Sequence, residues 1–176
     1  TADEIFAQLT QNIARGAKGI IWSGFDAALA RKHPDLAVAI RDCGRVLRAL
    51  SSGLLSSEPW DCKPQAPEKI NVTALSGRDR LVLALFNSDY VVGSPRYAWI
   101  TAQKTEIEIS APPGMHVKAA IEAGRERTTP IEFQEKEGRI RLQAGDIQTA
   151  KIIVLGGEGL PAELAAAYEA ALAEER

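Results

Sequence analysis

The stretch RLVLALFN, residues 80–87, determines how the rest of this sequence is interpreted. Every residue between Arg80 and Asn87 is apolar. Consecutive side chains of a strand point to opposite faces, so this segment presents apolar side chains on both. A short apolar run of this kind is typical of a strand that is covered on both sides. Residues 80–87 are therefore predicted to form a central strand of a sheet.

Short segments with a two-residue period lie on both sides of this strand. Residues 70–75 alternate before it, and the segments that follow it are 96–102, 105–110, 116–122, 131–135, 139–143 and 150–155. Turn sequences such as SGRD, APPG and KEG separate them. Roughly eight short strands at near-regular spacing, with no helical pattern between them, favour an antiparallel sandwich over a parallel sheet.

Three segments have a helical period instead. Thr1 and Glu4 form the sequence pattern of a capping box, which predicts the start of a helix. Residues 34–50 carry an apolar stripe at steps of three and four. The last segment, 160–176, has Pro161 near its first position, where proline is tolerated. Its apolar stripe is thin, and we expect this helix to dock loosely.

The run GIIWS, residues 19–23, is predicted to be a short buried strand between the first two helices. Residues 51–68 are rich in Ser, Pro and Gly and are predicted to be a surface linker. The expected divisions of the chain are a helix-strand-helix segment (1–60), a β-sandwich (61–157) and a C-terminal helix (158–176). We expect the sandwich, roughly residues 66–157, to fold alone and residues 1–60 not to.

Charge and hydropathy exclude several classes of partner. The 176 residues contain 21 Lys and Arg and 23 Asp and Glu, a net charge of −2, with no basic block. Nucleic acid is therefore not an expected partner, because its phosphates need clustered cations. No apolar run approaches the roughly 18 residues that span a bilayer, and no signal peptide is found, so no membrane partner is expected. The chain begins inside a helical pattern, and we expect it to be the tail of a longer protein.

Three stretches resemble one family of enzymes. ARGAKGIIWSG (14–24), LVLALFN (81–87) and GDIQTAKIIVL (145–155) are similar to the C-terminal end of clan-A, β-galactosidase-like glycoside hydrolases. The resemblance implies that residues 1–60 are the last βα unit of a (β/α)8 barrel, followed by an immunoglobulin-like sandwich. The expected fold class is mainly β with flanking helices: an antiparallel immunoglobulin-like β-sandwich preceded by a helix-strand-helix barrel remnant.

The resemblance implies no catalytic residue in this chain. Retaining enzymes of this kind use two carboxylates about 5–5.5 Å apart, on barrel strands that would precede Thr1. Trp22 and Asp26 would lie at the carboxyl end of the last barrel strand, where barrel enzymes place their sites. They are the candidate substrate-binding residues, with the indole stacking on a sugar ring. The alternative is that Trp22 is a core residue and Asp26 caps a turn.

The cysteines and histidines give weaker indications. Cys43 and Cys62 could form a disulfide, which would favour an extracellular or periplasmic location, or could be two free thiols. Without a CxxC pattern, and with His33 and His116 far apart, no metal site is expected, and no cofactor either.

The function that the sequence favours is a non-catalytic C-terminal region of a carbohydrate-active glycoside hydrolase. It would complete the barrel and support it, or its assembly into a homo-oligomer, through the sandwich. Carbohydrate would be a partner through the longer enzyme. Tyr97 and Trp99 share one face of a predicted strand and could stack on sugars or lie in the core. The alternatives are a stand-alone carbohydrate-binding or adhesive module, and a compact α+β domain in which 19–23 joins the sheet.

Overall fold

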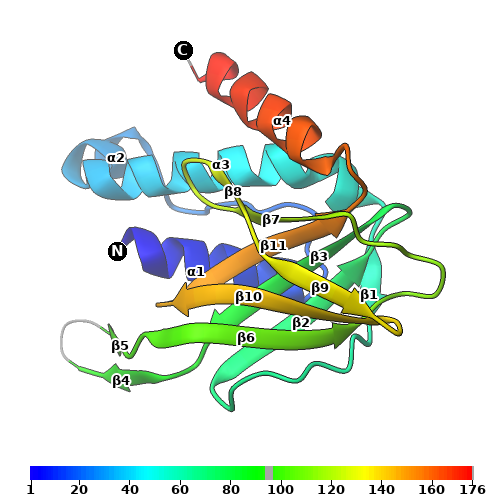
Figure 1. Ribbon diagram of the computed structural model, residues 1–176. Coiled ribbons are helices and arrows are strands. Elements are labelled where there is room, and N and C mark those ends of the chain that lie inside the picture. The colour runs from blue at the N-terminus through cyan, green and yellow to red at the C-terminus, as the bar shows by residue number, and fades with distance from the viewer. Residues whose placement is uncertain (94–96, 176) are drawn as a thin grey trace.

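The computed structural model describes residues 1–93 and 97–175 (Figure 1). Its helices are α1 (Ala2–Ala14), α2 (Ala27–Lys32), α3 (Pro34–Leu55) and α4 (Leu160–Glu174). Its strands are β1 (Glu58–Trp60), β2 (Ile70–Ser76), β3 (Arg80–Asn87), β4 (Tyr90–Val92), β5 (Tyr97–Trp99), β6 (Ala102–Ser110), β7 (Ala119–Ala123), β8 (Thr128–Pro130), β9 (Phe133–Lys136), β10 (Arg139–Ile147) and β11 (Ala150–Gly156). The prediction of a mainly β chain with flanking helices is confirmed. None of the helices in the described region of the chain is long and apolar enough to cross a membrane.

The strands form two sheets and a separate hairpin, and every pairing is antiparallel. The larger sheet has the order β1-β2-β3-β11-β7-β8, the smaller one the order β6-β10-β9, and β4 pairs with β5. β3 lies between β2 and β11, as its sequence predicts, with Val82 opposite Val154 and Leu83 opposite Ile153. A strand at this position has neighbours on both edges, so its backbone groups are paired within the sheet.

Alternate residues of β3 enter two different apolar clusters. Leu81, Leu83 and Leu85 pack with residues of the smaller sheet, among them Ile109 and Leu142. These residues belong to an apolar cluster that fills the space between the two sheets, and its buried side chains are almost fully inaccessible to solvent. The two-residue period of the strand therefore places one set of leucines inside the sandwich.

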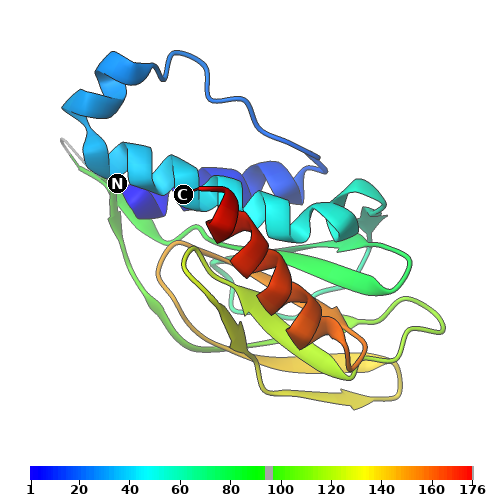
Figure 2. The ribbon, with the colours of Figure 1, turned by 90° about the horizontal axis from the view of Figure 1, so that it is seen from above.

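The other face of β3 and β11 lies under the helices. Val82 and Val154 share an apolar cluster with Leu9 of α1, Leu50 of α3 and Leu164 of α4. Figure 2 shows α3 and α4 lying across this face. The molecule thus has three layers: helices, the six-stranded sheet and the three-stranded sheet.

The ends of the helices follow the sequence closely. The Thr1 hydroxyl accepts a hydrogen bond from the Glu4 backbone N–H at 3.3 Å, which completes the predicted capping box. α3 begins at Pro34, but it continues to Leu55, and β1 then forms at Glu58–Trp60. The prediction of a linker over 51–68 is therefore wrong at its start, because the apolar stripe of α3 extends to Leu54, which is buried against the sheet.

Residues 19–23 do not form the predicted strand in the structure of the 176-residue chain. These residues have no strand pairing and form an exposed loop between α1 and α2 (Figure 2). A strand needs a neighbour for its backbone groups, and the described residues offer none here. The loop is attached through Lys18, whose Nζ donates to the Leu54 carbonyl at 2.7 Å and to the Ser57 carbonyl. Ile21 is 93% exposed as a result.

Candidate functional site

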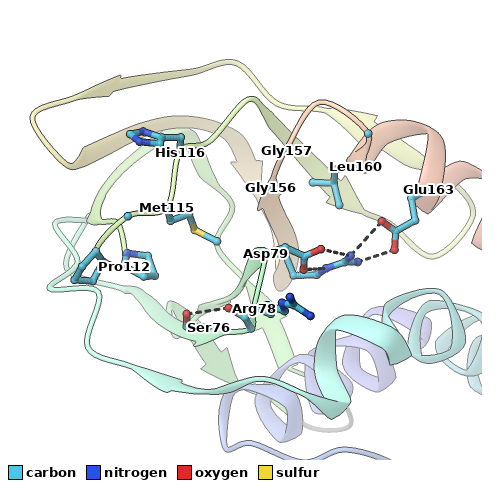
Figure 3. A pocket seen from close by; sticks show the side chains of 15 residues that line it. Ser76, Arg78, Asp79, Pro112, Met115, His116, Gly156, Gly157, Leu160 and Glu163 are labelled. Atoms are coloured by element: carbon cyan, nitrogen blue, oxygen red, sulfur yellow. Dashed lines mark hydrogen bonds and ion pairs between the residues drawn. The ribbon is translucent and has the colours of Figure 1, made fainter.

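A cavity of about 610 Å³ opens at one end of the sandwich (Figure 3). It lies between the β2–β3 turn, the loop before β7 and the segment that connects β11 to α4. Its lining includes the polar side chains Ser76, Arg78, Asp79, His116 and Glu163.

Arg80 organises the charge of this cavity. Its Nε donates to Asp79 Oδ1 at 3.0 Å, and its Nη1 donates to Glu163 Oε1 at 2.9 Å (dashed in Figure 3). The hydrogen bond from Arg80 lowers the pKa of Asp79 below its ordinary value, and the two carboxylates together raise the pKa of Arg80. One guanidinium therefore binds both carboxylates of the cavity lining through charge-assisted hydrogen bonds.

The cavity lining also includes one histidine, His116. His116 is exposed, with Nδ1 3.8 Å from Glu135 Oε1. No group of three or more His, Cys, Asp or Glu residues that could hold a metal ion is found within residues 1–93 and 97–175. Asp79 and Glu163 are the two carboxylates that line the cavity, and Arg80 binds both of them.

A second concave site lies between α1 and the β4–β5 hairpin. It has a volume of about 220 Å³ and is called the aromatic cleft here. The residues that line the aromatic cleft are Glu4, Ala7, Gln8, Gln11, Phe86, Tyr90, Tyr97 and Trp99.

The pairing of the hairpin brings the aromatic rings of the cleft together. Tyr90 lies opposite Trp99 and Val92 opposite Tyr97, so these side chains share one face. The ring centroid of Tyr90 is 4.9 Å from that of Trp99 and 5.3 Å from that of Tyr97. The shared face predicted for Tyr97 and Trp99 is thus confirmed, and Tyr97, at 51% exposed, is not a core residue.

Trp22 and Asp26 lie away from both sites. Trp22 is partly buried and packs at the edge of the helix-side cluster. The Asp26 carboxylate is exposed and caps α2, where its Oδ1 accepts from the backbone N–H groups of Ala28 at 2.9 Å and Leu29 at 2.8 Å. Neither residue lines the cavity at the sandwich end or the aromatic cleft. Their role in substrate binding stays a prediction.

The two cysteines are free thiols. Cys43 lies in the cluster under the helices and Cys62 in the cluster between the sheets, so the six-stranded sheet separates them. Burial raises the pKa of the Cys43 thiol to about 12 and also raises the pKa of Cys62. Both are therefore unreactive core residues at neutral pH, and the disulfide alternative does not hold.

Sequence reasoning missed Tyr90 and the ion pair between Arg80 and Glu163. The first could have been found, because the apolar triplet Tyr90–Val92 and the segment 97–99 are spaced as a hairpin around Gly93. The second could not, because Glu163 lies 83 residues from Arg80. Nothing local in the sequence indicates that pairing.

The comparisons with known proteins gave distant similarities only. No model of a protein family matches the sequence, and no curated protein matches it either. α-L-Fucosidase isoenzyme 2 from Paenibacillus thiaminolyticus is similar over 69% of this chain at 17% identity, with a TM-score of 0.43. A cycloisomaltooligosaccharide glucanotransferase from a Paenibacillus species, complexed with cycloisomaltoheptaose, is similar over 67% at 5% identity, with a TM-score of 0.49.

The chain spans 17% of the length of the first of these proteins and 21% of the second. Both names describe enzymes that process glycosides. At TM-scores below 0.5, however, the two similarities establish neither the fold nor the function of this chain.

Proposed function

We propose that this chain is a non-catalytic C-terminal region of a carbohydrate-active glycoside hydrolase, which completes a (β/α)8 barrel and supports it. The proposal is based on residues 19–23, which have the sequence of a buried strand but form an exposed loop. An apolar segment in which Ile21 is 93% exposed lies outside the sheets. Transfer of an apolar side chain from water into a protein interior is favourable, so a surface that covered Ile21 would be stabilised by the contact. A place as the last strand of a barrel would bury Ile21 and pair its backbone.

The rest of the chain has a place in the same proposal. α1 and α3 would be the helices before and after that last strand, within residues 1–60. The two facing sheets, whose strands other than β1 lie within 61–157, would be an immunoglobulin-like sandwich, and 158–176 would be the helix that packs between the sandwich and α3. The structural support is that α1 and α3 pack on the six-stranded sheet in one apolar cluster, so a barrel and the sandwich would be held rigidly together.

The non-catalytic aspect of the proposal rests on the carboxylates. Asp79 and Glu163 are both bound by Arg80, and Asp26 caps α2. Hydrolysis with retention needs two carboxyl groups about 5–5.5 Å apart with different protonation states. In this chain the acidic groups at the cavity have structural partners instead.

The proposal predicts different effects of Ile21→Asp in two contexts. In the 176-residue chain, the substitution is at an exposed site, and we expect the free energy of unfolding to change by less than about 0.5 kcal/mol. In the longer protein encoded by the same gene, it would place a charge in a buried strand and lower stability by several kcal/mol, on the order of 3–5. Thermal unfolding of both proteins measures the difference.

Val91→Asp is the matched control, because Val91 is an exposed apolar residue on β4, away from the loop. It should have a small effect in both proteins. An equally small effect of Ile21→Asp in the longer protein, or a longer gene that encodes no barrel, would show that the proposal is wrong.

The proposed substrate contacts of Trp22 and Asp26 can be tested in the longer enzyme. Trp22→Ala should raise KM about tenfold, which corresponds to about 1.4 kcal/mol of lost binding, while Tm falls little. A Tm drop that reflects about 3–5 kcal/mol, with KM unchanged, would make Trp22 a core residue instead. KM and Tm are measured on the same variant.

Asp26→Asn separates the two roles of that carboxylate. Asn caps a helix about as well as Asp, so α2 keeps its hydrogen bonds while the negative charge is lost. A rise in KM with Tm unchanged would support substrate contact, and no change in either would reduce Asp26 to a helix cap.

A further inference from the structure

The aromatic cleft has the features of a binding site for a small neutral ligand. We infer that it binds one pyranose ring of a neutral carbohydrate, stacked on the face formed by Tyr97 and Trp99. This inference goes beyond the proposed function and does not depend on it, because the cleft is formed entirely by α1, β3, β4 and β5 of this chain.

The aromatic cleft has a wall of aromatic rings. Four aromatic rings gather here: Phe86 and Trp99 have ring centroids 5.6 Å apart and perpendicular planes, and Tyr90 and Tyr97 lie against Trp99. The β4–β5 hairpin is joined to neither sheet through strand pairing among the described residues. The side chains of Tyr90 and Tyr97 are 39% and 51% exposed. Aromatic groups held at the surface in a concave site provide contact area at low cost in side-chain entropy.

The aromatic cleft also has polar side chains, which come from α1. α1 presents Gln8 and Gln11 to the cleft, and an amide side chain both donates and accepts hydrogen bonds. Glu4, the one carboxylate of the lining, already bonds to the amino group of Thr1. Hydroxyl groups also donate and accept, so the amides match a ligand with several hydroxyls better than they match a charged one.

Trp99 contributes a hydrogen-bond donor that is unsatisfied within the described part of the chain. The indole Nε1–H of Trp99 is buried and has no acceptor within the described region of the chain. A buried donor without an acceptor is unfavourable. Tyr97 is half exposed, and a rotation of its side chain would open the edge of Trp99 to a ligand hydroxyl. Such a hydroxyl would supply the missing acceptor.

A pyranose ring combines these requirements. One face of a β-D-glucoside or a β-D-galactoside carries mainly C–H groups, which carry partial positive charge, whereas the face of an aromatic ring is negative. The hydroxyls lie around the rim of the sugar, where the amides of Gln8 and Gln11 would be their hydrogen-bond partners. A few convergent polar groups beside an apolar wall are typical of small-molecule sites. A protein partner, such as a second copy of this chain, is the competing occupant.

The test is a titration followed by NMR of the ¹⁵N-labelled 176-residue chain. The probes are methyl β-D-glucopyranoside and methyl β-D-galactopyranoside, with sorbitol as a polyol that has no ring face. We expect at least one glycoside to give saturable shifts of the Trp99 indole N–H and the side-chain amides of Gln8 and Gln11, and sorbitol to give none. The indole signals of Trp22 and Trp60 are internal references.

Variants locate the site within the chain. Tyr97→Ala should weaken binding about tenfold, which corresponds to about 1.4 kcal/mol. Val91→Ala, on the opposite face of the hairpin, should leave binding unchanged. Gln8→Ala, at an exposed helical position where Ala favours the helix, should weaken binding and serves if Tyr97→Ala does not fold.

Three results would overturn the inference. They are the absence of shifts with both glycosides up to their solubility, equal shifts with sorbitol, and unchanged affinity in the folded variants of Tyr97 and Gln8. Shifts of Trp99 that depend on protein concentration without sugar would assign the hairpin to self-association instead. The barrel proposal is tested on Ile21 in the longer protein, so its failure is distinguishable from the failure of this inference.

Discussion

Residues 61–157, produced without the flanking helices, are expected to be unfolded or aggregated, whereas the whole chain unfolds cooperatively. The alternating pattern of the strands predicts that this segment folds alone. The packing of the six-stranded sheet leads us to expect the opposite, because one of its faces is covered only by residues outside the range 61–157.

The covered face contains Val82 and Ala84 of β3 with Ile152 and Val154 of β11, all of them at most 3% exposed. The residues that bury them come from the helices: Phe6, Leu9 and Ile13 of α1, Val46, Leu50 and Leu54 of α3, and Leu164 and Tyr168 of α4. Removal of the helices would expose a contiguous apolar face on the central strands. Soluble monomers rarely expose apolar patches larger than a few hundred Å².

Circular dichroism during heating and size-exclusion chromatography of the fragment measure the outcome. Leu9→Ala in the whole chain is a milder test of the same helix–sheet contact. It should lower the free energy of unfolding by about 2–5 kcal/mol, the usual cost of deleting a fully buried leucine side chain. A monomeric fragment 61–157 with a sigmoidal thermal transition would contradict the expectation. In that case the sandwich core alone would be sufficient for folding.

The longer strands were predictable because each one carries its own evidence, whereas the three-residue strands β1, β4 and β8 were not predicted. β3 and β11 are short runs of apolar residues between turn sequences, and a strand covered on both faces needs such a run. β2, β6 and β10 alternate between apolar and polar residues. The apolar residues of this alternation lie between the two sheets. A local pattern is sufficient in these cases because the period of the side chains is a property of the strand itself.

The loop at 19–23 shows where local patterns are insufficient. Its apolar residues match a buried strand, but a strand exists only where another strand lies beside it, and no local pattern shows whether one does. The stripe of α3 likewise predicts a buried face without indicating what covers it. The position of the helices on the six-stranded sheet therefore could not be derived from the sequence.

The candidate sites divide in the same way. The common face of Tyr97 and Trp99 follows from the strand period, so it was predictable. The cleft itself needs α1 beside the hairpin, and the Arg80–Glu163 pair needs α4 beside β3. Both are long-range contacts without a local pattern. Trp22 and Asp26 were chosen from the resemblance to glycoside hydrolases, and their role in substrate binding stays a prediction.

The second large effect is expected from Arg45, which fastens α4 to the rest of the molecule. Its Nε and Nη2 donate to the two carboxylate oxygens of Glu175 at 3.1 and 2.7 Å, and its Nη1 donates to the Arg125 carbonyl at 3.2 Å. Its Nη2 also lies 3.2 Å from Asp42 Oδ1. A thin apolar stripe predicts loose docking of α4, but this cluster of charges adds a firm attachment near its C-terminal end.

Arg45→Met should lower the free energy of unfolding by about 3 kcal/mol. The side chain of Arg45 is 6% exposed and that of Glu175 14%, so the substitution leaves carboxylates with little access to water. Breaking a buried ion pair in this way costs about 3–5 kcal/mol, and the position of the cluster near the surface favours the lower end. For a chain of this size, Tm should fall by roughly 6–12 °C.

Arg48→Met is the matched control, because the neighbouring pair Arg48–Glu174 is 56% and 67% exposed. Exposed pairs contribute about 0–1 kcal/mol, so Tm should fall by only about 0–4 °C. Equal effects of the two substitutions would show that the cluster at Arg45 contributes no more than a surface pair.

Acid provides an independent measurement on the same cluster. The hydrogen bond from Arg45 lowers the pKa of Glu175 below its ordinary value in the folded chain. Folding therefore gains stability above the ordinary glutamate pKa of about 4.3, and the gain is lost as pH falls through the lowered value. Urea unfolding at about pH 7 and about pH 3 should show a smaller acid-induced loss in Arg45→Met than in the unmodified chain. If both chains lose the same stability between these pH values, Glu175 does not anchor α4 through its charge, and the apolar contacts of Leu164 and Tyr168 must hold the helix instead.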